Sequence, residues 1–323
     1  FSGLLASPGV MAGNMIAVVL LCGGVCYLGV KAGVERITKW MMICLLLLMV
    51  VLAVNSILLP GSGEGLRYYL YPDFSRLAEY GAQEVIFAAM GQAFFTLSLG
   101  IGALAIFGSY IGKRKSLTGE AIWVTVLDTF VAIMAGLIIF PACFAFGVNP
   151  SSGPNLLFVT LPNVFIHMSF GRLWGALFFL FMAFASFSTV IAVFENLICA
   201  FLELLRIDRK IIIRWGMLLI ILLSLPCVFG FNIWSDFQPL GKGSGVLDLE
   251  DFLVSNNILP LGSLVYLVFC TSRYGWGWKN FIREANTGNG IRFPHAIRFY
   301  ATWILPLIVL YIFVAGYWAK FFS

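Results

Sequence analysis

Two carboxylic acids lie inside long apolar stretches of this sequence, where a charge is costly. Asp128 lies about eight residues into one stretch, which is ~12 Å along a helix at about 1.5 Å per residue. A carboxylate at that depth costs about 2.5–3.5 kcal/mol on insertion scales, and such residues usually mark a path for an ion or a substrate. We interpret Asp128 as a binding residue, with a structural hydrogen bond between helices as the alternative. Glu195, in the middle of another apolar stretch, is expected to form a structural or a gating pair, and the sequence leaves open which.

Small and hydroxyl-bearing residues interrupt a third apolar stretch, residues 86–111. Gly100 and Gly102 fall near its middle, where each glycine costs about 1 kcal/mol of helix propensity relative to alanine. Thr96 and Ser98 precede them, and their hydroxyls can satisfy a freed backbone group. The pattern is typical of a discontinuous helix, whose exposed carbonyls and amides bind ions and a zwitterion at the middle of the bilayer. A helix-packing face of small residues is the alternative.

Two adjacent hydroxyl residues, Ser188 and Thr189, lie in the same apolar stretch as Glu195. Together with a backbone carbonyl one turn earlier, at Ala185, they could coordinate a small hard cation, because such cations take oxygen ligands. The more common role of Ser and Thr in a membrane helix is packing or hydrogen bonding to the preceding turn, and this alternative stays open.

Other kinds of chemistry are not expected. The chain has only two histidines, His167 and His295, in different loops, which disfavours a histidine metal cluster or a Ser-His-Asp triad. The seven cysteines form no CxxC pair, and Cys22 and Cys26, one helical turn apart, are interpreted as packing residues. The net charge of +5 is spread over short loops, which disfavours nucleic-acid binding. The protein is therefore predicted not to be an enzyme and to use no organic cofactor.

The elements that position these residues are predicted to be membrane-spanning helices. Of the 323 residues, 61% are hydrophobic and 11% are charged, against about 45–50% and about 25% in ordinary soluble domains. The expected fold class is therefore an all-α polytopic protein of the cytoplasmic membrane. A helix needs about 20 apolar residues to cross the hydrocarbon core. Scanning by that rule predicts eight spans, at about 12–30, 38–59, 86–111, 121–146, 173–204, 212–230, 252–271 and 297–320.

The charges of the loops predict the orientation of these helices. Lysine and arginine accumulate in short loops on the cytoplasmic side of a membrane. Four loops carry a net positive charge and are placed in the cytoplasm: 31–39, 112–120, 205–214 and 272–298. Loops 60–85 and 231–251 carry a net negative charge and are placed outside, as is loop 147–172, which is rich in Pro, Gly, Ser and Asn. Both ends of the chain are then expected to face outward.

Four motifs point together to one known family. They are the glycine-interrupted run 91–102, the loop Gly153–Pro162, the pair Ser188-Thr189 followed by Glu203, and the turn Lys31–Arg36. They resemble elements of the neurotransmitter:sodium symporter family. The run 91–102 resembles its unwound sixth helix, and the loop 153–162 resembles its re-entrant outer loop. The pair at 188–189 with Glu203 resembles its eighth helix, and the turn 31–36 resembles the turn between its helices four and five. The chain resembles the bacterial amino-acid branch of this family from about residue 12 to its end.

The resemblance implies a leucine-transporter-like inverted-repeat fold. The eight spans then correspond to family helices four to eleven, in a single transmembrane transporter domain over residues 1–323 that lacks helices one to three. The implied function is sodium-coupled symport of an amino acid, of hydrophobic or aromatic kind, by alternating access. The implied partners are that amino acid, sodium ions and the lipid bilayer, and the sequence indicates no oligomeric state. A proton-coupled or other solute carrier of the same fold, or a truncated chain that does not transport, is the alternative.

The resemblance also implies roles for individual residues, carried over by position. The substrate pocket falls on Phe95, Thr96, Ser98, Ile101 and Val193. The first sodium site falls on Thr96 and Asp128, and the second on the carbonyl of Ala185 with Ser188 and Thr189. The inner gate falls on Tyr110 and Glu203, and the outer gate on Asp251.

Three positions depart from the usual pattern of the family. Asp128 stands where asparagine is common, and Ala132, one turn on, stands where chloride-dependent members place a chloride-binding serine. Because Asp128 can supply the fixed negative charge that chloride gives some relatives, we predict chloride-independent transport. Ile101 stands where a bulky aromatic residue is often found, which leaves room for a larger substrate side chain and favours a branched or aromatic amino acid.

Overall fold

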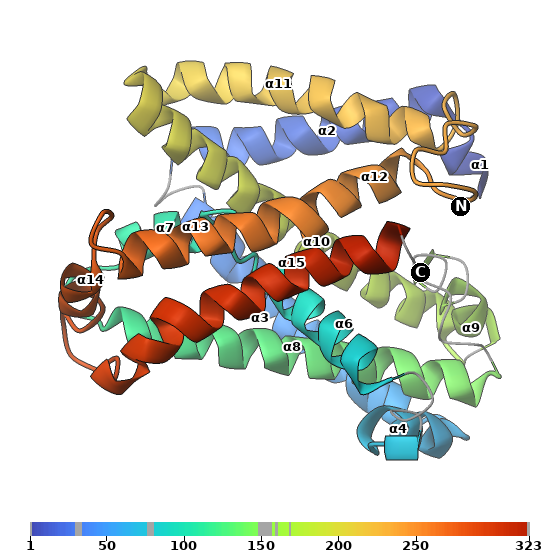
Figure 1. Cartoon of the computed structure of the whole chain (residues 1–323). Coiled ribbons are helices and arrows are strands. Elements are labelled where there is room, and N and C mark those ends of the chain that lie inside the picture. The colour runs from blue at the N-terminus through green and yellow to red at the C-terminus, as the bar shows by residue number, and fades with distance from the viewer. Residues whose placement is uncertain are drawn as a thin grey trace. The chain divides into compact units, whose positions relative to one another are not determined.

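The computed structural model describes residues 2–29, 34–75, 81–147, 157–158, 161–167 and 169–321. These residues form helices joined by turns (Figure 1), and the β-type pairing among them is an isolated bridge between Lys115 and Asn289. The chain divides into two compact units, each built from two separate segments. The first comprises Phe1–Asp73 and Phe130–Trp234, and the second comprises Phe74–Thr129 and Ser235–Ser323. The single transporter domain over residues 1–323 stays a prediction.

The first unit is a bundle of long apolar helices with short helices at their ends. The long ones are α2 (Pro8–Tyr27), α3 (Arg36–Ile57), the second half of α8 (Leu117–Ala145), α10 (Gly171–Leu205) and α11 (Arg209–Gly230). The short ones are α1 (Ser2–Leu5), α4 (Ser62–Leu70) and α9 (Leu161–His167). Helix α10 packs against α2, α3, α9 and α11, and α2 also packs against α11. Helix α10 is therefore the central element of this unit.

Small side chains let the helices of the first unit approach closely. Cys22 and Cys26 are fully buried in a cluster that joins α2, α10 and α11, which confirms their interpretation as packing residues. A Cβ atom on Gly23 would lie 2.3 Å from the sulfur of Met217, so a larger residue there would force the Met217 side chain to move. Elsewhere the Ser56 hydroxyl donates a hydrogen bond of 2.7 Å to the carbonyl oxygen of Ile138, which ties α3 to α8.

The second unit contains the interrupted apolar stretch. Its helices are α6 (Ala82–Thr96), α7 (Ala103–Tyr110), the first half of α8, α12 (Val246–Leu253), α13 (Leu259–Thr271), α14 (Trp278–Ala285) and α15 (Leu305–Phe321), with a 3-10 turn, η4 (His295–Ile297). Two π-helical turns, η3 (Val254–Ile258) and η5 (Tyr300–Ile304), join α12 to α13 and lead into α15. Helix α13 packs against both α15 and α6.

Seven of the described helices are long and apolar enough to cross a membrane. They are Pro8–Tyr27, Arg36–Ile57, Leu117–Ala145, Gly171–Leu205, Arg209–Gly230, Val246–Thr271 and His295–Trp318. These confirm seven predicted spans and the all-α polytopic class. The remaining predicted span, 86–111, is interrupted, because α6 ends at Thr96 and α7 begins at Ala103.

One predicted loop ends earlier in the structure than the sequence analysis expected. Residues 231–251 were expected to be a loop, but α12 begins at Val246 and extends the next span to Val246–Thr271. The three acidic residues of α12 hid this start from a hydropathy scan. The carboxylate of Asp248 lies in the first turn and accepts a hydrogen bond of 2.6 Å from the backbone N–H of Gly245, so it stabilises the helix start. Two resembling motifs, Lys31–Arg36 and Gly153–Pro162, fall largely outside the described residues.

Candidate functional site

The interruption between α6 and α7 is the central feature of the second unit. Gly100 and Gly102 have φ angles of +87° and +89°, which glycine adopts far more readily than other residues. Ser98 has a φ of +49°, one of three positive values at non-glycine residues in the described part of the chain. Such backbone costs about 1–3 kcal/mol and clusters at functional sites. The discontinuous helix predicted from the sequence is confirmed, and a continuous helix through these residues is excluded.

The interruption rests directly on the backbone of α13. A Cβ atom on Gly100 would lie 2.2 Å from the carbonyl oxygen of Leu259, and one on Gly262 would lie 2.2 Å from the carbonyl oxygen of Gly100. Neither position has room for a side chain. Helix α13 therefore supports the interruption through a contact between two glycines, which the sequence analysis did not anticipate.

Thr96 and Asp128 come together at the interruption. Thr96 is the last residue of α6, and its hydroxyl oxygen lies 3.1 Å from each carboxylate oxygen of Asp128 in α8. The chain thus brings a carboxylate and a hydroxyl, 32 residues apart, next to a stretch of non-helical backbone. Oxygen atoms of these kinds are the ligands that hard cations take in proteins, so the donor set fits sodium. A structural hydrogen bond between helices, the alternative for Asp128, is formed as well.

The second predicted sodium set lies in α10, in the first unit. The hydroxyls of Ser188 and Thr189 both donate to the carbonyl oxygen of Ala185, at 2.8 Å and 3.1 Å. This is the back-bonding geometry that Ser and Thr commonly adopt in membrane helices. The three oxygen atoms lie within one helical turn, and their role as sodium ligands stays a prediction.

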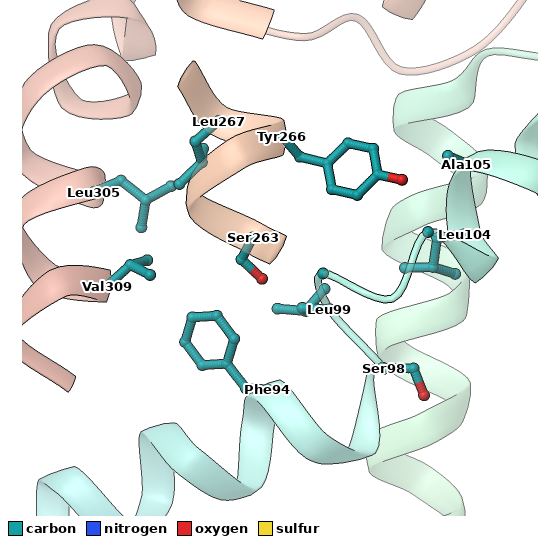
Figure 2. A pocket seen from close by; sticks show the side chains of 12 residues that line it. Phe94, Ser98, Leu99, Leu104, Ala105, Ser263, Tyr266, Leu267, Leu305 and Val309 are labelled. Carbon is teal, nitrogen blue, oxygen red and sulfur yellow. The ribbon is translucent and has the colours of Figure 1, made fainter. Parts of the chain in front are cut away.

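Two cavities lie beside the interruption within the second unit. One, of about 320 Å³, is mostly apolar (Figure 2), and Ser98 is the predicted substrate residue that lines it. The other, of about 360 Å³, is more polar, and both Phe95 and Asp251 line it. Ile101 is 44% exposed and lies outside both cavities. The predicted substrate residues of this unit therefore do not share one cavity.

The polar cavity contains groups that the sequence analysis missed. Gln92 from α6 and Asn256 from η3 line it beside Asp251. The carboxylate of Asp251 accepts a hydrogen bond of 2.8 Å from the hydroxyl of Ser255, which also lines the cavity. The signal was present in the sequence, since amide and hydroxyl side chains inside an apolar span are uncommon. Gln92 and Asn256 lie inside the predicted spans 86–111 and 252–271, but the sequence analysis assigned a role to neither of them.

The remaining predicted residues are exposed at helix surfaces of their own units. Val193 in α10 is 50% exposed, and Glu203 near the end of the same helix is exposed as well. Tyr110, the last residue of α7, is 46% exposed, and its ring makes an edge contact with Phe107. Their roles in substrate binding and gating stay predictions.

Glu195 forms a buried ion pair with an arginine that the sequence analysis did not single out. Its carboxylate is fully buried and lies 2.5 Å and 2.9 Å from the two terminal nitrogens of Arg209, at the start of α11. Arg209 also donates to the carbonyl oxygen of Cys26, at 3.2 Å, so it links α2, α10 and α11. Glu195 therefore forms a pair, as expected, and this pair links helices within the first unit; a gating role stays the alternative.

These features together define a class of protein. A polytopic helical protein with an interrupted helix, and with a carboxylate at the interruption, has the construction of secondary transporters that bind solutes and ions at broken helices. The chain matches the Sodium:neurotransmitter symporter family over residues 2–320, and it belongs to that family. Because this is a family of symporters, the prediction that the protein is not an enzyme is confirmed.

Two bacterial relatives match most of this chain. A sodium-dependent transporter of Haemophilus influenzae is 32% identical over 290 residues, which are 89% of this chain and 61% of the relative. The sodium-dependent transporter YhdH of Bacillus subtilis is 33% identical over 288 residues, 88% of this chain and 62% of the relative. The chain thus spans less than two thirds of the length of these relatives.

A solved structure shares the fold. The crystal structure of MhsT in complex with L-phenylalanine matches 98% of this chain and 70% of the MhsT chain, with a TM-score of 0.85 and 33% sequence identity. This similarity confirms the leucine-transporter-like fold that the motifs implied.

Proposed function

We propose that this protein couples the inward movement of sodium to the uptake of an amino acid across the cytoplasmic membrane by alternating access. The observation that carries the proposal is the pair formed by Thr96 and Asp128, 3.1 Å apart at the interrupted helix. A carboxylate inside a membrane is costly, and a bound cation would offset that cost. The hydroxyl and the non-helical backbone at residues 97–102 would complete an oxygen-rich site.

The position of Thr96 supports coupling between ion and solute. Sodium that moves inward across about 100 mV gains ~2.3 kcal/mol per charge from the voltage alone. This energy reaches the solute only if the binding of one favours the binding of the other. Thr96 belongs to both the implied substrate set and the implied first sodium set, so a bound sodium ion would adjoin the substrate. Ser188 and Thr189, whose oxygens cluster at Ala185, are the proposed second sodium site.

The substrate in this proposal is a hydrophobic or aromatic amino acid. The relative MhsT, 33% identical to this chain, was solved in complex with L-phenylalanine. At the position of Ile101 many family members have a larger aromatic residue, so the smaller side chain leaves room for a larger substrate. Phe95 and Ser98, on either side of the end of α6, would contact the substrate from the interrupted helix.

Transport in proteoliposomes tests the proposal. The reconstituted protein should accumulate radiolabelled phenylalanine when an inward sodium gradient is imposed. Asp128→Asn should require about ten-fold more sodium, because it removes the charged ligand, a loss of about 1.4 kcal/mol. Asp236→Asn makes the same substitution at an exposed position and should behave as the wild type. Uptake driven by a proton gradient without sodium would instead support the proton-coupled carrier. No uptake under either gradient would support a chain that does not transport.

Chloride replacement tests a second part of the proposal. In α8, Ala132 offers no hydroxyl to bind an anion, and its carbonyl oxygen lies 3.4 Å from the Tyr69 hydroxyl. The carboxylate of Asp128 provides a permanent negative charge on the same helix. Wild-type uptake should therefore be unchanged when gluconate replaces chloride, and Asp128→Asn should become weak or chloride-sensitive. Wild-type uptake that falls in gluconate would contradict this part.

A further inference from the structure

The apolar cavity beside the interrupted helix differs in character from the polar one, and Ser98 is the residue of the proposed substrate set that lines it. It lies between the segment 98–105, helix α13 and the start of α15 (Figure 2). Phe94, Leu99, Leu267 and Leu305 form much of its wall, and its lining residues include no charged side chain. Its volume of about 320 Å³ falls at the lower end of the range of small-molecule sites, about 300–1,000 Å³. The cavity is therefore large enough for a small organic molecule.

One polar group in the wall has no partner. The Ser263 side chain is buried, with 9% of the residue exposed, and its hydroxyl oxygen makes no hydrogen bond within the described ranges of the chain. Figure 2 shows this hydroxyl directed into the space between Phe94 and Leu99. Buried polar groups in folded proteins nearly always have a hydrogen-bond partner. The hydroxyl therefore indicates that a molecule in this cavity carries a hydrogen-bonding group.

The same wall connects the cavity to the interruption. Ser263 adjoins Gly100, since a Cβ atom on that glycine would lie 3.0 Å from the Ser263 hydroxyl. One turn further along α13, the Tyr266 hydroxyl would lie 2.6 Å from a Cβ atom on Gly102. In Figure 2 the Tyr266 ring extends toward Leu104 at the start of α7. A molecule in this cavity would thus contact both the interrupted segment and the helix that supports it.

We infer that this cavity binds a small, uncharged, mostly hydrocarbon molecule with a single hydroxyl group, which holds residues 97–102 against α13. The uncharged lining excludes a zwitterionic amino acid, whose two charges would be buried without partners. The amino-acid substrate is better matched to the polar cavity, which contains Asp251 and Gln92. Water alone would leave most of the wall without a polar contact, because the lining is mostly apolar and a buried water needs about two to four polar partners.

Binding of two matched probes tests the site directly. 1-Naphthol carries one hydroxyl on a hydrocarbon body, and naphthalene is the same body without it. Displacement of radiolabelled probe from the purified full chain in detergent should show one saturable site. 1-Naphthol should bind about ten-fold more tightly than naphthalene, because only the hydroxyl can pair with Ser263. Equal affinities would mean that Ser263 pairs with water only, and the absence of saturable binding would mean that there is no site; either result overturns the inference.

Three variants locate the site. Ser263→Ala should retain naphthalene binding and lose the ten-fold preference for 1-naphthol. Its thermal midpoint should not fall, because the hydroxyl has no partner in the protein. Leu305→Trp fills the cavity and should abolish the binding of both probes. Leu307→Trp places the same bulk on the same helix at a position that is 65% exposed, and it should bind both probes as the wild type does. A preference for 1-naphthol that survives Ser263→Ala would place the probe elsewhere.

The effect on transport rests on the proposed function and is measured separately. A molecule that holds the interruption against α13 should lower the maximal rate of sodium-driven uptake several-fold and leave the KM of the substrate unchanged. Saturable binding without any effect on uptake would overturn the claim that the molecule holds the interruption. If the protein shows no sodium-driven uptake at all, the proposed function fails, while the binding measurements still decide whether the site exists.

Discussion

Replacing Gly262 by alanine is the sharpest test of how the interrupted helix is supported. The added methyl carbon would lie 2.2 Å from the carbonyl oxygen of Gly100. Ordinary contact between such atoms begins at about 3.5 Å, so the two backbones must separate by roughly 1 Å. The Cβ atom is fixed to the backbone of α13 and its neighbour is a backbone oxygen, so no flexible side chain can move aside to relieve the contact. Overpacking of this kind typically costs about 1–3 kcal/mol, and we expect a loss of stability in that range.

The same displacement should weaken substrate binding. If it moves residues 97–102 relative to Asp128, the implied ligands no longer converge on one point. A loss of 1.4 kcal/mol in the bound state corresponds to about a ten-fold loss of affinity. We therefore expect the KM for sodium-driven uptake to rise about ten-fold in Gly262→Ala, with surface expression little changed.

Thermal unfolding in detergent and uptake in proteoliposomes measure these two effects. Gly108→Ala is the matched control, because nothing lies within 4 Å of a Cβ atom at that position of α7. Alanine there should leave uptake unchanged and stabilise the helix by about 0.5–1 kcal/mol. Equal behaviour of the two variants would refute the reasoning, since it would show that α13 does not set the position of the interruption.

Three further predictions concern other residues. Glu195→Gln should lower stability by about 3 kcal/mol, because it leaves Arg209 partly buried without its counter-charge; a thermal midpoint equal to that of the wild type would show that the ion pair is not needed. Thr189→Val preserves volume and deletes a proposed ligand, so sodium-driven uptake should need much more sodium, and an unaltered sodium dependence would remove Thr189 from the second site. Ile101→Phe adds a ring to the pocket, where overpacking costs about 1–3 kcal/mol, so large substrates should lose about ten-fold in affinity while alanine-sized ones lose little. Competition of labelled phenylalanine by the other amino acids measures this, and an unchanged ranking by size would place Ile101 outside the pocket.

The positions of the membrane helices follow from the sequence alone. Hydrocarbon excludes unpaired backbone groups, so each crossing must be a run of about 20 apolar residues in helical form. Eight spans were predicted on this basis, and seven of them are present as helices long and apolar enough to cross a membrane. The start of α12 was missed for the same reason, because its acidic first turns look like a loop to any scan of hydropathy.

The interruption of the sixth family helix was also predictable, but only as one of two alternatives. Gly100 and Gly102 permit positive φ angles and equally permit close packing of a continuous helix. The structure shows that both properties are used: the two residues have positive φ angles, and Gly100 packs against the backbone of α13. Composition and spacing could not decide between the alternatives, because they do not specify what lies next to each glycine.

Pairings between distant residues were decided by tertiary structure. The sequence identified Asp128 and Glu195 as costly charges that need partners, since the cost depends only on depth in the membrane. It did not identify Arg209 as the partner of Glu195, because that choice depends on how α10 and α11 pack. The unpaired hydroxyl of Ser263 and its cavity have no sequence signal either: a serine in an apolar span looks the same whether it faces a neighbouring helix or a cavity. Hydropathy and propensity are properties of a residue and its chain neighbours, whereas partners and cavities are properties of surfaces that meet only after folding.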